Sequence, residues 1–114
     1  MFIDSSHVLK IGSDVQYELL EIIPRLKLGV IIHFHDIFLP SEYPREWVMK
    51  QHIFWNEQYL LQAFLAFNSS FEVFWSSSFM NARHDDLLDK AFISSRPGSV
   101  RPCSFWIHRL DPEK

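Results

Sequence analysis

Cysteine and glycine are scarce in this sequence of 114 residues, which contains one Cys and three Gly. The single cysteine, Cys103, excludes an internal disulfide and a cysteine metal cluster, and it is typical of a protein in a reducing cytoplasm. No two of the glycines form a G-x-G motif. The sequence therefore offers no glycine-rich loop of the kind that lets backbone amides approach a cofactor closely.

A basic stripe and a long apolar run are also missing. The 11 Lys and Arg residues are interspersed with 14 Asp and Glu residues, for a formal charge of -3, so the electrostatic footprint of nucleic-acid binding is absent. No apolar run approaches the length of a membrane span, and no charged-then-apolar leader precedes the first residues. We expect a soluble cytoplasmic protein with neither nucleic acid nor membrane as a partner.

Apolar and aromatic residues, in contrast, are abundant. The composition is 47% hydrophobic and 16% aromatic, with 11 Phe, four Trp and three Tyr, which indicates one globular domain over residues 1–114 with enough apolar mass for a core. This aromatic content exceeds what a small core usually absorbs. Some of these rings are therefore expected to line a pocket or to cover an interface.

The first third of the chain has the pattern of a strand, a helix and a second strand. Residues 1–4 read as the end of a strand that finishes in an acid, and Ser13 has the form of a helix cap. A second strand starts at Leu28 and ends where His35 and Asp36 follow. Because such a crossover joins parallel strands, both polar ends should meet at one edge of the sheet. The apolar face expected for the helix consists of Val15, Leu19, Ile22 and Leu26.

Helices and strands continue to alternate along the rest of the chain. Prolines 40 and 44 bracket a turn, and polar clusters mark the later loops. The apolar spacing after this turn is wide, which favours a helix packed on a sheet. The apolar residues expected on its inner face are Trp55, Tyr59, Phe64 and Phe67, with Leu60 and Leu61. The expected elements are one broken helix or two short helices over residues 45–51 and 56–67, a strand over 71–76, a helix over 81–92, a polar loop over 94–102 and a last strand over 104–110.

Four motifs, in this order, resemble one enzyme family. They are Phe-Ile-Asp-x-x-His at residues 2–7, Pro-x-Leu-Lys-x-Gly at 24–29, His-Asp-Ile-Phe at 35–38 and Ser-Phe-Trp-Ile at 104–107. Together they resemble the C-terminal half of class I S-adenosylmethionine-dependent methyltransferases, and the subgroup most similar is that of small-molecule O-methyltransferases of the macrolide-sugar and catechol types.

This resemblance implies an α/β fold that forms the C-terminal part of a Rossmann-like methyltransferase sheet. The strands would be numbers 4-5-7-6 of the family's sheet, with the last strand antiparallel and helices on the flanks. The chain would then be a single partial domain over residues 1–114 that lacks the N-terminal cofactor-binding half. We expect either a truncated protein or a partner that supplies the other half.

The resemblance also implies a metal site at the strand ends. In metal-dependent relatives the matching positions bind a divalent ion, Mg or Mn, and they fall on Asp4, His35 and Asp36. The imidazole of His35 stands where relatives carry an acid or its amide, so it either shifts preference from magnesium toward manganese, iron or zinc or indicates a vestigial site. The alternative is a hydrogen-bonded polar cluster without a metal.

Other side chains receive roles from the same resemblance. His7 stands where the macrolide-sugar enzymes place a general base, and its ordinary pKa near 6.5 suits proton abstraction; the alternative is a His that caps the loop. Tyr43 and Trp47 fall where relatives place the wall of the substrate pocket, although such aromatics are more often core residues. His33 is expected to be a core or supporting residue rather than a ligand.

The expected function is therefore part of an O-methyltransferase that acts on a small hydroxylated acceptor with S-adenosylmethionine and is inactive alone. A first alternative is a truncated, non-catalytic remnant that survives as a homodimer or an interaction module, because loss of the other half would expose the edge of the first strand. A second alternative is a metal-binding module that uses Asp4, His35 and Asp36 without methyl transfer.

Overall fold

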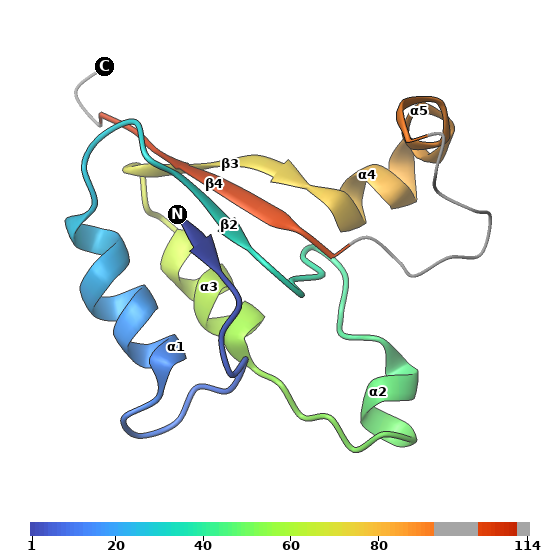
Figure 1. Ribbon diagram of the computed structural model, residues 1–114, viewed down its shortest axis with the longest axis horizontal. Coiled ribbons are helices and arrows are strands. Elements are labelled where there is room, and N and C mark those ends of the chain that lie inside the picture. Colours follow the sequence, from blue (N-terminus) through green and yellow to red (C-terminus); the bar gives the residue numbers. More distant parts are fainter. Residues whose placement is uncertain (93–102, 112–114) are drawn as a thin grey trace.

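A four-stranded sheet forms the centre of the protein in the computed structural model, which describes residues 1–92 and 103–111. The strands lie in the order β1-β2-β4-β3; β1 is parallel to β2, and β4 is antiparallel to both of its neighbours (Figure 1). The predicted class, a mixed α/β fold, is confirmed. The strand bounds are β1 Phe2–Ile3, β2 Ile31–Phe34, β3 Phe71–Ser76 and β4 Phe105–Arg109.

Short helical segments connect these strands. None of the helices in the two described ranges is both long and apolar enough to cross a membrane. The predicted polar loop over residues 94–102, with Gly98, lies outside the described residues. The helical bounds are α1 Asp14–Tyr17, a π-helical turn Glu18–Ile22, a 3-10 turn Ile23–Arg25, α2 Arg45–Met49, α3 Glu57–Leu65, α4 Ser77–Arg83 and α5 Asp85–Ala91.

Two predicted boundaries were wrong. The second strand starts at Ile31 and not at Leu28, because Gly29 adopts a φ of +81° in a turn that precedes the strand. The predicted single helix over residues 81–92 is two helices, α4 and α5, separated at His84. The first of them starts earlier than expected, since the Ser76 hydroxyl caps it by accepting a hydrogen bond from the Phe79 amide.

The first helical segment begins at the predicted cap, but it continues as a π-helical turn and a 3-10 turn. Ser13 caps it by accepting a hydrogen bond from the Gln16 amide. Its fully buried side chains are Val15, Leu19 and Ile23, whereas Ile22 is only partly buried. A π-helical turn contains more residues than an α-helical turn, so it moves the inward position from Ile22 to Ile23.

The core lies between one face of the sheet, the helical segment 14–25 and α3 (Figure 1). Side chains alternate along β2, so Ile32 and Phe34 are fully buried in this core while Ile31 stays 39% exposed. The inner face of α3 was predicted wrongly in part, because Tyr59 is 45% exposed and Phe67, which follows the helix, is fully exposed. The buried face at the start of α3 carries polar side chains instead, and these belong to the site described next.

Candidate functional site

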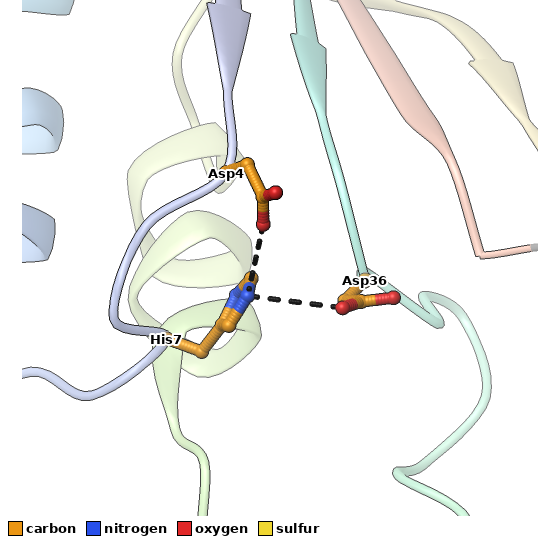
Figure 2. Close-up of side chains that lie close together, drawn as sticks. All are labelled: Asp4, His7 and Asp36. Atoms are coloured by element: carbon orange, nitrogen blue, oxygen red, sulfur yellow. Dashed lines mark ion pairs between the residues drawn. The ribbon is translucent and has the colours of Figure 1, made fainter.

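Polar side chains gather where β1 and β2 end. Ile3 pairs in register with Phe34, and the His35 amide donates to the Ile3 carbonyl at 2.9 Å. Asp4 and Asp36 therefore follow the carboxyl ends of two neighbouring parallel strands, as the crossover rule predicted. His7 lies in the loop after β1 and its ring points back toward both acids (Figure 2).

The ring of His7 lies between the two carboxylates. Its Nε2 atom is 3.3 Å from Oδ1 of Asp4 and 3.8 Å from Oδ2 of Asp36 (Figure 2). The side chain of His7 is buried and that of Asp36 is mostly so, whereas Asp4 is 52% exposed. The cluster is thus fixed on its inner side and open to solvent at Asp4.

Two residues of the cluster, His7 and Asp36, have unusual backbone conformations. His7 has a φ of 58° and Asp36 has a φ of 57°, both in the left-handed region. Asp and His visit this region more readily than most residues, yet such a conformation commonly costs on the order of 1–3 kcal/mol and persists where the surrounding structure enforces it. Such strain concentrates at functional sites, which makes this cluster the leading candidate.

Glu57, the first residue of α3, holds His7 from the inside. Its Oε2 atom is 2.8 Å from Nδ1 of His7, and it also accepts a hydrogen bond from the Ser5 hydroxyl at 3.0 Å. Glu57 is only 1% exposed. In addition, the His7 carbonyl accepts hydrogen bonds from the amides of Asn56 and Glu57 at the start of α3. Both the ring and the main chain of His7 are therefore attached to this helix.

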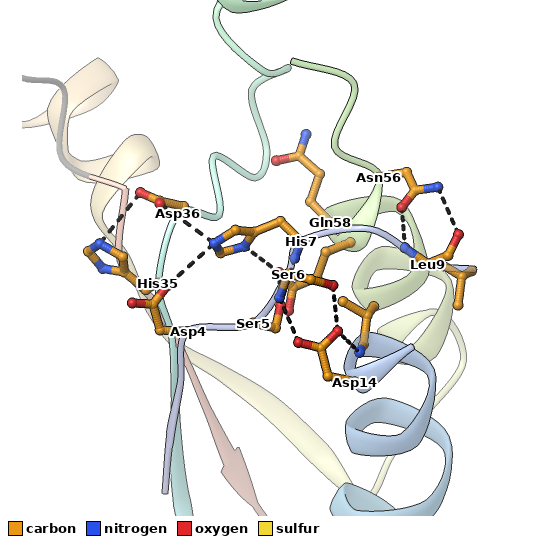
Figure 3. A network of polar contacts seen from close by, with 12 residues as sticks. Asp4, Ser5, Ser6, His7, Leu9, Asp14, His35, Asp36, Asn56 and Gln58 are labelled. Carbon is orange, nitrogen blue, oxygen red and sulfur yellow. Dashed lines mark hydrogen bonds and ion pairs between the residues drawn. The ribbon is translucent and has the colours of Figure 1, made fainter. Parts of the chain in front are cut away.

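A wider polar network fixes the loop that carries His7. The Asp14 carboxylate accepts hydrogen bonds from the amide and the hydroxyl of Ser6, and Asn56 accepts one from the Leu9 amide (Figure 3). These contacts tie the loop to the starts of two helices. They leave little freedom for the ring of His7 to turn away from the acids.

The partner of Nδ1 decides the chemistry of the other ring nitrogen. Because the Glu57 carboxylate accepts a hydrogen bond from Nδ1, the neutral form of His7 carries its free lone pair on Nε2, which faces Asp4 and Asp36. Burial lowers the pKa of His7, but the hydrogen bond to Glu57 and the negative charges of Glu57, Asp36 and Asp4 outweigh it. The net result is a pKa raised above the ordinary 6.5.

The structure brings together Asp4, His7 and Asp36 as the group that could hold a metal ion. One ligand atom from each lies within 4.8 Å of the others. His35, which the resemblance assigned to the metal, lies outside this group with its Nε2 atom 3.6 Å from Oδ1 of Asp36, on the side away from His7 (Figure 3). A nitrogen with two carboxylates favours manganese, iron or zinc over magnesium.

Cys103 also contacts the cluster. Its thiol donates a hydrogen bond to Oδ1 of Asp36 at 3.0 Å. Burial, together with the hydrogen bond and the charge of Asp36, raises the pKa of Cys103 to about 11. The thiol is therefore protonated at neutral pH and is a poor nucleophile, although it helps to orient Asp36.

The two residues expected in a substrate pocket lie in an aromatic cluster beside His7. Tyr43 is buried, and its hydroxyl accepts a hydrogen bond from the Gln58 amide at 3.1 Å. Trp47 is partly exposed and packs edge-on against Trp55 with ring centroids 5.1 Å apart. Trp55 in turn lies against the ring of His7 at 4.1 Å. Tyr43 thus lies on the buried side of this aromatic cluster, and Trp47 lies on its more exposed side.

Sequence reasoning missed Glu57. The residue was read only as part of a helix over 56–67, and its partner His7 lies 50 residues earlier. One signal was available, because Glu57 stands four positions before Leu61 and shares its face of the helix. A carboxylate on the buried face of a helix needs partners, and Glu57 has them in His7 and the Ser5 hydroxyl.

The grounds for a functional assignment are the geometry of this cluster and the order of the strands around it. No protein-family model, no curated protein and no solved structure matches the chain.

Proposed function

We propose that this chain is the acceptor-binding part of an S-adenosylmethionine-dependent O-methyltransferase for small hydroxylated molecules. His7 is the general base, and it takes the proton of the acceptor hydroxyl on Nε2. The observation that carries this proposal is the arrangement of Glu57, His7 and the two acids, in which Nδ1 is held at 2.8 Å and Nε2 faces the open side of the cluster.

The surroundings of His7 suit a base. When Nε2 gains a proton, the ring becomes positively charged between Asp4, Asp36 and Glu57, which stabilise that charge. A base whose pKa lies near the working pH is effective in proton transfer, and such a group typically contributes 10²- to 10⁴-fold to a rate. Trp55 covers one face of the ring, and Nε2 points toward Asp4 and Asp36.

The strand order also supports the proposal. The resemblance implies strands 4-5-7-6 with the last one antiparallel, and the sheet has the order β1-β2-β4-β3 with β4 antiparallel between β2 and β3. Placing the last strand of a chain between two earlier strands requires a specific connectivity. This arrangement favours the methyltransferase family over other α/β folds with parallel sheets.

The described residues do not fit the cofactor itself. S-adenosylmethionine, when bound, supplies the methyl group, and family members hold it with a glycine-rich loop. Gly12 and Gly29, the glycines among the described residues, stand 17 positions apart and form no such loop. The proposal therefore assigns cofactor binding to residues outside this chain, such as a further segment of the same protein or a partner.

Methyl transfer by a longer form of the protein tests the role of His7. The chain is expressed with the coding sequence upstream of Met1, and transfer of a labelled methyl group to catechol and to a 6-deoxyhexose glycoside is measured. We expect His7→Asn, which tolerates the same backbone conformation, to lower kcat at least about 100-fold. The matched control His108→Asn alters a histidine paired with Glu72 elsewhere on the sheet and should change kcat less than about twofold.

Three results would count against this function. The first is a longer protein that neither binds S-adenosylmethionine in calorimetry nor methylates either acceptor. The second is a His7→Asn variant that is as active as the parent. The third is a variant with a raised KM and an unchanged kcat, because His7 would then bind the acceptor without taking its proton.

Divalent cation binding is a second candidate function. It is favoured by the three ligand atoms of Asp4, His7 and Asp36, which lie within 4.8 Å of one another. The carboxylate of Glu57 on the far nitrogen of His7 is the usual support for a histidine ligand. A bound cation would lower the pKa of a coordinated hydroxyl. Because Nε2 has one lone pair, His7 would then be a ligand and not the base.

Manganese titration of the 114-residue chain separates the two candidates. If the cation site exists, Asp36→Asn and His7→Asn should each weaken Mn²⁺ binding at least tenfold in calorimetry. His35→Asn distinguishes the observed group from the one that the resemblance implied, since only the latter uses His35. If the chain binds no Mn²⁺, the cation site is excluded, and the general base stays the proposed role of His7.

The free edge of β1 is a surface on which a partner of this chain could pair. β1 pairs only with β2 among the described strands, and Phe2 on it is 65% exposed. An unpaired edge with exposed apolar side chains is a surface for a further strand or a second copy. The homodimer and the separate cofactor-binding half therefore both remain predictions, which sedimentation of the 114-residue chain can distinguish.

A further inference from the structure

A cavity with a volume of about 560 Å³ lies along β3, far along the sheet from β1. Its walls come from five parts of the fold: the segment after β2, the helix α3, the strand β3, the helix α4 and the start of β4. The side chains that shape it are mainly apolar. They include Leu39, Leu65, Val73, Phe74, Phe79 and Met80.

An irregularity in β3 exposes this strand to the cavity. Val73 pairs with Ile107 and Trp75 pairs with Trp106, so Phe74 is an extra residue that opposes no partner in β4. In a regular strand only alternate side chains reach one side. Here all four residues from 73 to 76 line the cavity. Bulges of this kind redirect side chains and are common beside binding sites.

The lining carries no charged side chain. Trp75 donates its indole N–H to the Ser77 hydroxyl at 2.8 Å, and the Ser76 hydroxyl donates to the Leu39 carbonyl. No Lys, Arg, Asp or Glu lies among the lining residues that the structure describes, and the Gln62 amide is the further polar group there. The lining therefore offers no opposite charge to a phosphate, a nucleotide or a carboxylate, and it suits a neutral ligand.

Exposed apolar side chains surround the opening. Val73 is 53% exposed, Phe74 is 60% exposed and Phe79 is 43% exposed. Exposed apolar side chains that line a common hollow favour a binding site. The volume falls in the range of about 300–1,000 Å³ that is typical of small-molecule pockets.

We propose that this cavity is a binding site for a neutral, mainly apolar small molecule, such as one with fused aromatic rings. The cavity takes no residue from the cluster of Asp4, His7 and Asp36, so this site stands independently of the proposed methyl transfer. Binding would cover the three exposed side chains at the rim and fill the space beside Trp75.

Titration of the 114-residue chain with the neutral fluorescent probe N-phenyl-1-naphthylamine tests the site. We expect saturable binding of one probe per chain and a shift of the Trp75 indole N–H signal in NMR, assigned with Trp75→Phe. Val73→Asp places a charge in the wall, and Met80→Trp fills the cavity without adding charge. Each should weaken binding at least tenfold.

Leu28→Asp is the matched control, because Leu28 is 56% exposed and lies outside the lining. It should bind the probe as the parent does, within about twofold. If Val73→Asp proves unfolded by circular dichroism, Met80→Trp decides alone. The proposal is overturned if the parent shows no saturable binding, if Met80→Trp binds as tightly as the parent, or if the Trp75 signal does not move.

Discussion

Nδ1 of His7 lies 2.8 Å from Oε2 of Glu57, and both side chains are more than nine-tenths buried although 50 residues separate them in the chain. The other oxygen of Glu57, Oε1, is buried and has no hydrogen-bond partner among the described residues. The buried carboxylate therefore depends on its contacts with His7 and with the Ser5 hydroxyl. The protonation state of His7 and the stability of the first turn of α3 are therefore linked.

Replacement of Glu57 by Gln should lower the pKa of His7. The change removes the negative charge and the strong acceptor that raise this pKa, while the burial that lowers it remains. We expect the pKa to fall toward or below the ordinary 6.5. Titration of the His7 ring nitrogens by NMR measures it, and the same spectra report whether Nδ1 still carries the proton.

Glu46→Gln is the control for this prediction, because Glu46 is exposed and its ion pair among the described residues is with Lys50, at the end of the same helix. It should leave the titration of His7 unchanged. An unaltered pKa in Glu57→Gln would mean that Asp4 and Asp36 alone set the charge of the ring. The importance assigned to Glu57 would then be wrong.

The stability of the protein should depend on pH through His7. Its folded pKa is raised above the unfolded value of 6.5, so the folded state binds more protons between these two values. The resulting stabilisation is fully present below pH 6.5 and is lost as the pH rises through the folded pKa. The difference in unfolding free energy between the parent and His7→Asn should therefore shrink from pH 6 to pH 8.5.

Urea unfolding at several pH values measures this difference. Comparison with the variant matters because His33, whose pKa is lowered, contributes a pH dependence of opposite sign. A difference that grows with pH would contradict the raised pKa of His7. Parallel curves would show that His7 has the same affinity for protons in both states.

His33→Phe should stabilise the protein, most of all in mild acid. His33 is 8% exposed, its Nδ1 atom has no partner among the described residues, and its ring packs between Phe2 and Trp106 at 4.7 and 4.5 Å. Burial and the nearby His35 lower its pKa, so stability falls as the pH drops below 6.5 through the folded value. Phe removes both the unpartnered atom and this titration.

The expected gain in unfolding free energy is about 1–3 kcal/mol, the usual cost of a buried polar group without a partner. It should be larger at pH 5 than at pH 8, as measured by urea unfolding. A loss of stability at both values would indicate that an ordered water or a residue outside the described ranges satisfies Nδ1.

Two neighbouring residues of β2 should respond very differently to truncation. Ile32 is fully buried against the helices, whereas Ile31 is 39% exposed on the opposite face. Ile32→Ala should therefore cost about 2–5 kcal/mol of unfolding free energy, and Ile31→Ala less than about 1 kcal/mol. Equal losses for the two variants, measured by urea unfolding, would mean that the other face of the sheet is also covered in solution.

Local patterns were sufficient for much of the fold. The cap at Ser13, the strand over residues 71–76 and the last strand near 104–110 depend on neighbours in the chain, and the structure contains all three. The crossover placed Asp4 and Asp36 at one edge of the sheet because the two strands that it joins are parallel. The burial of Ile23 in place of Ile22 was not predicted, because hydrophobic spacing does not distinguish an α-helical turn from a π-helical turn.

The sequence by itself determined the α/β class, the polar strand ends and the presence of His7 beside them, because these depend on residue type and on short-range geometry. Only the tertiary structure decided that His7, and not His35, lies between the two acids, and that Glu57 fixes its ring. Those contacts join residues from three separate parts of the chain. They depend on how the loop after β1 packs against the start of α3, which no spacing in the sequence specifies.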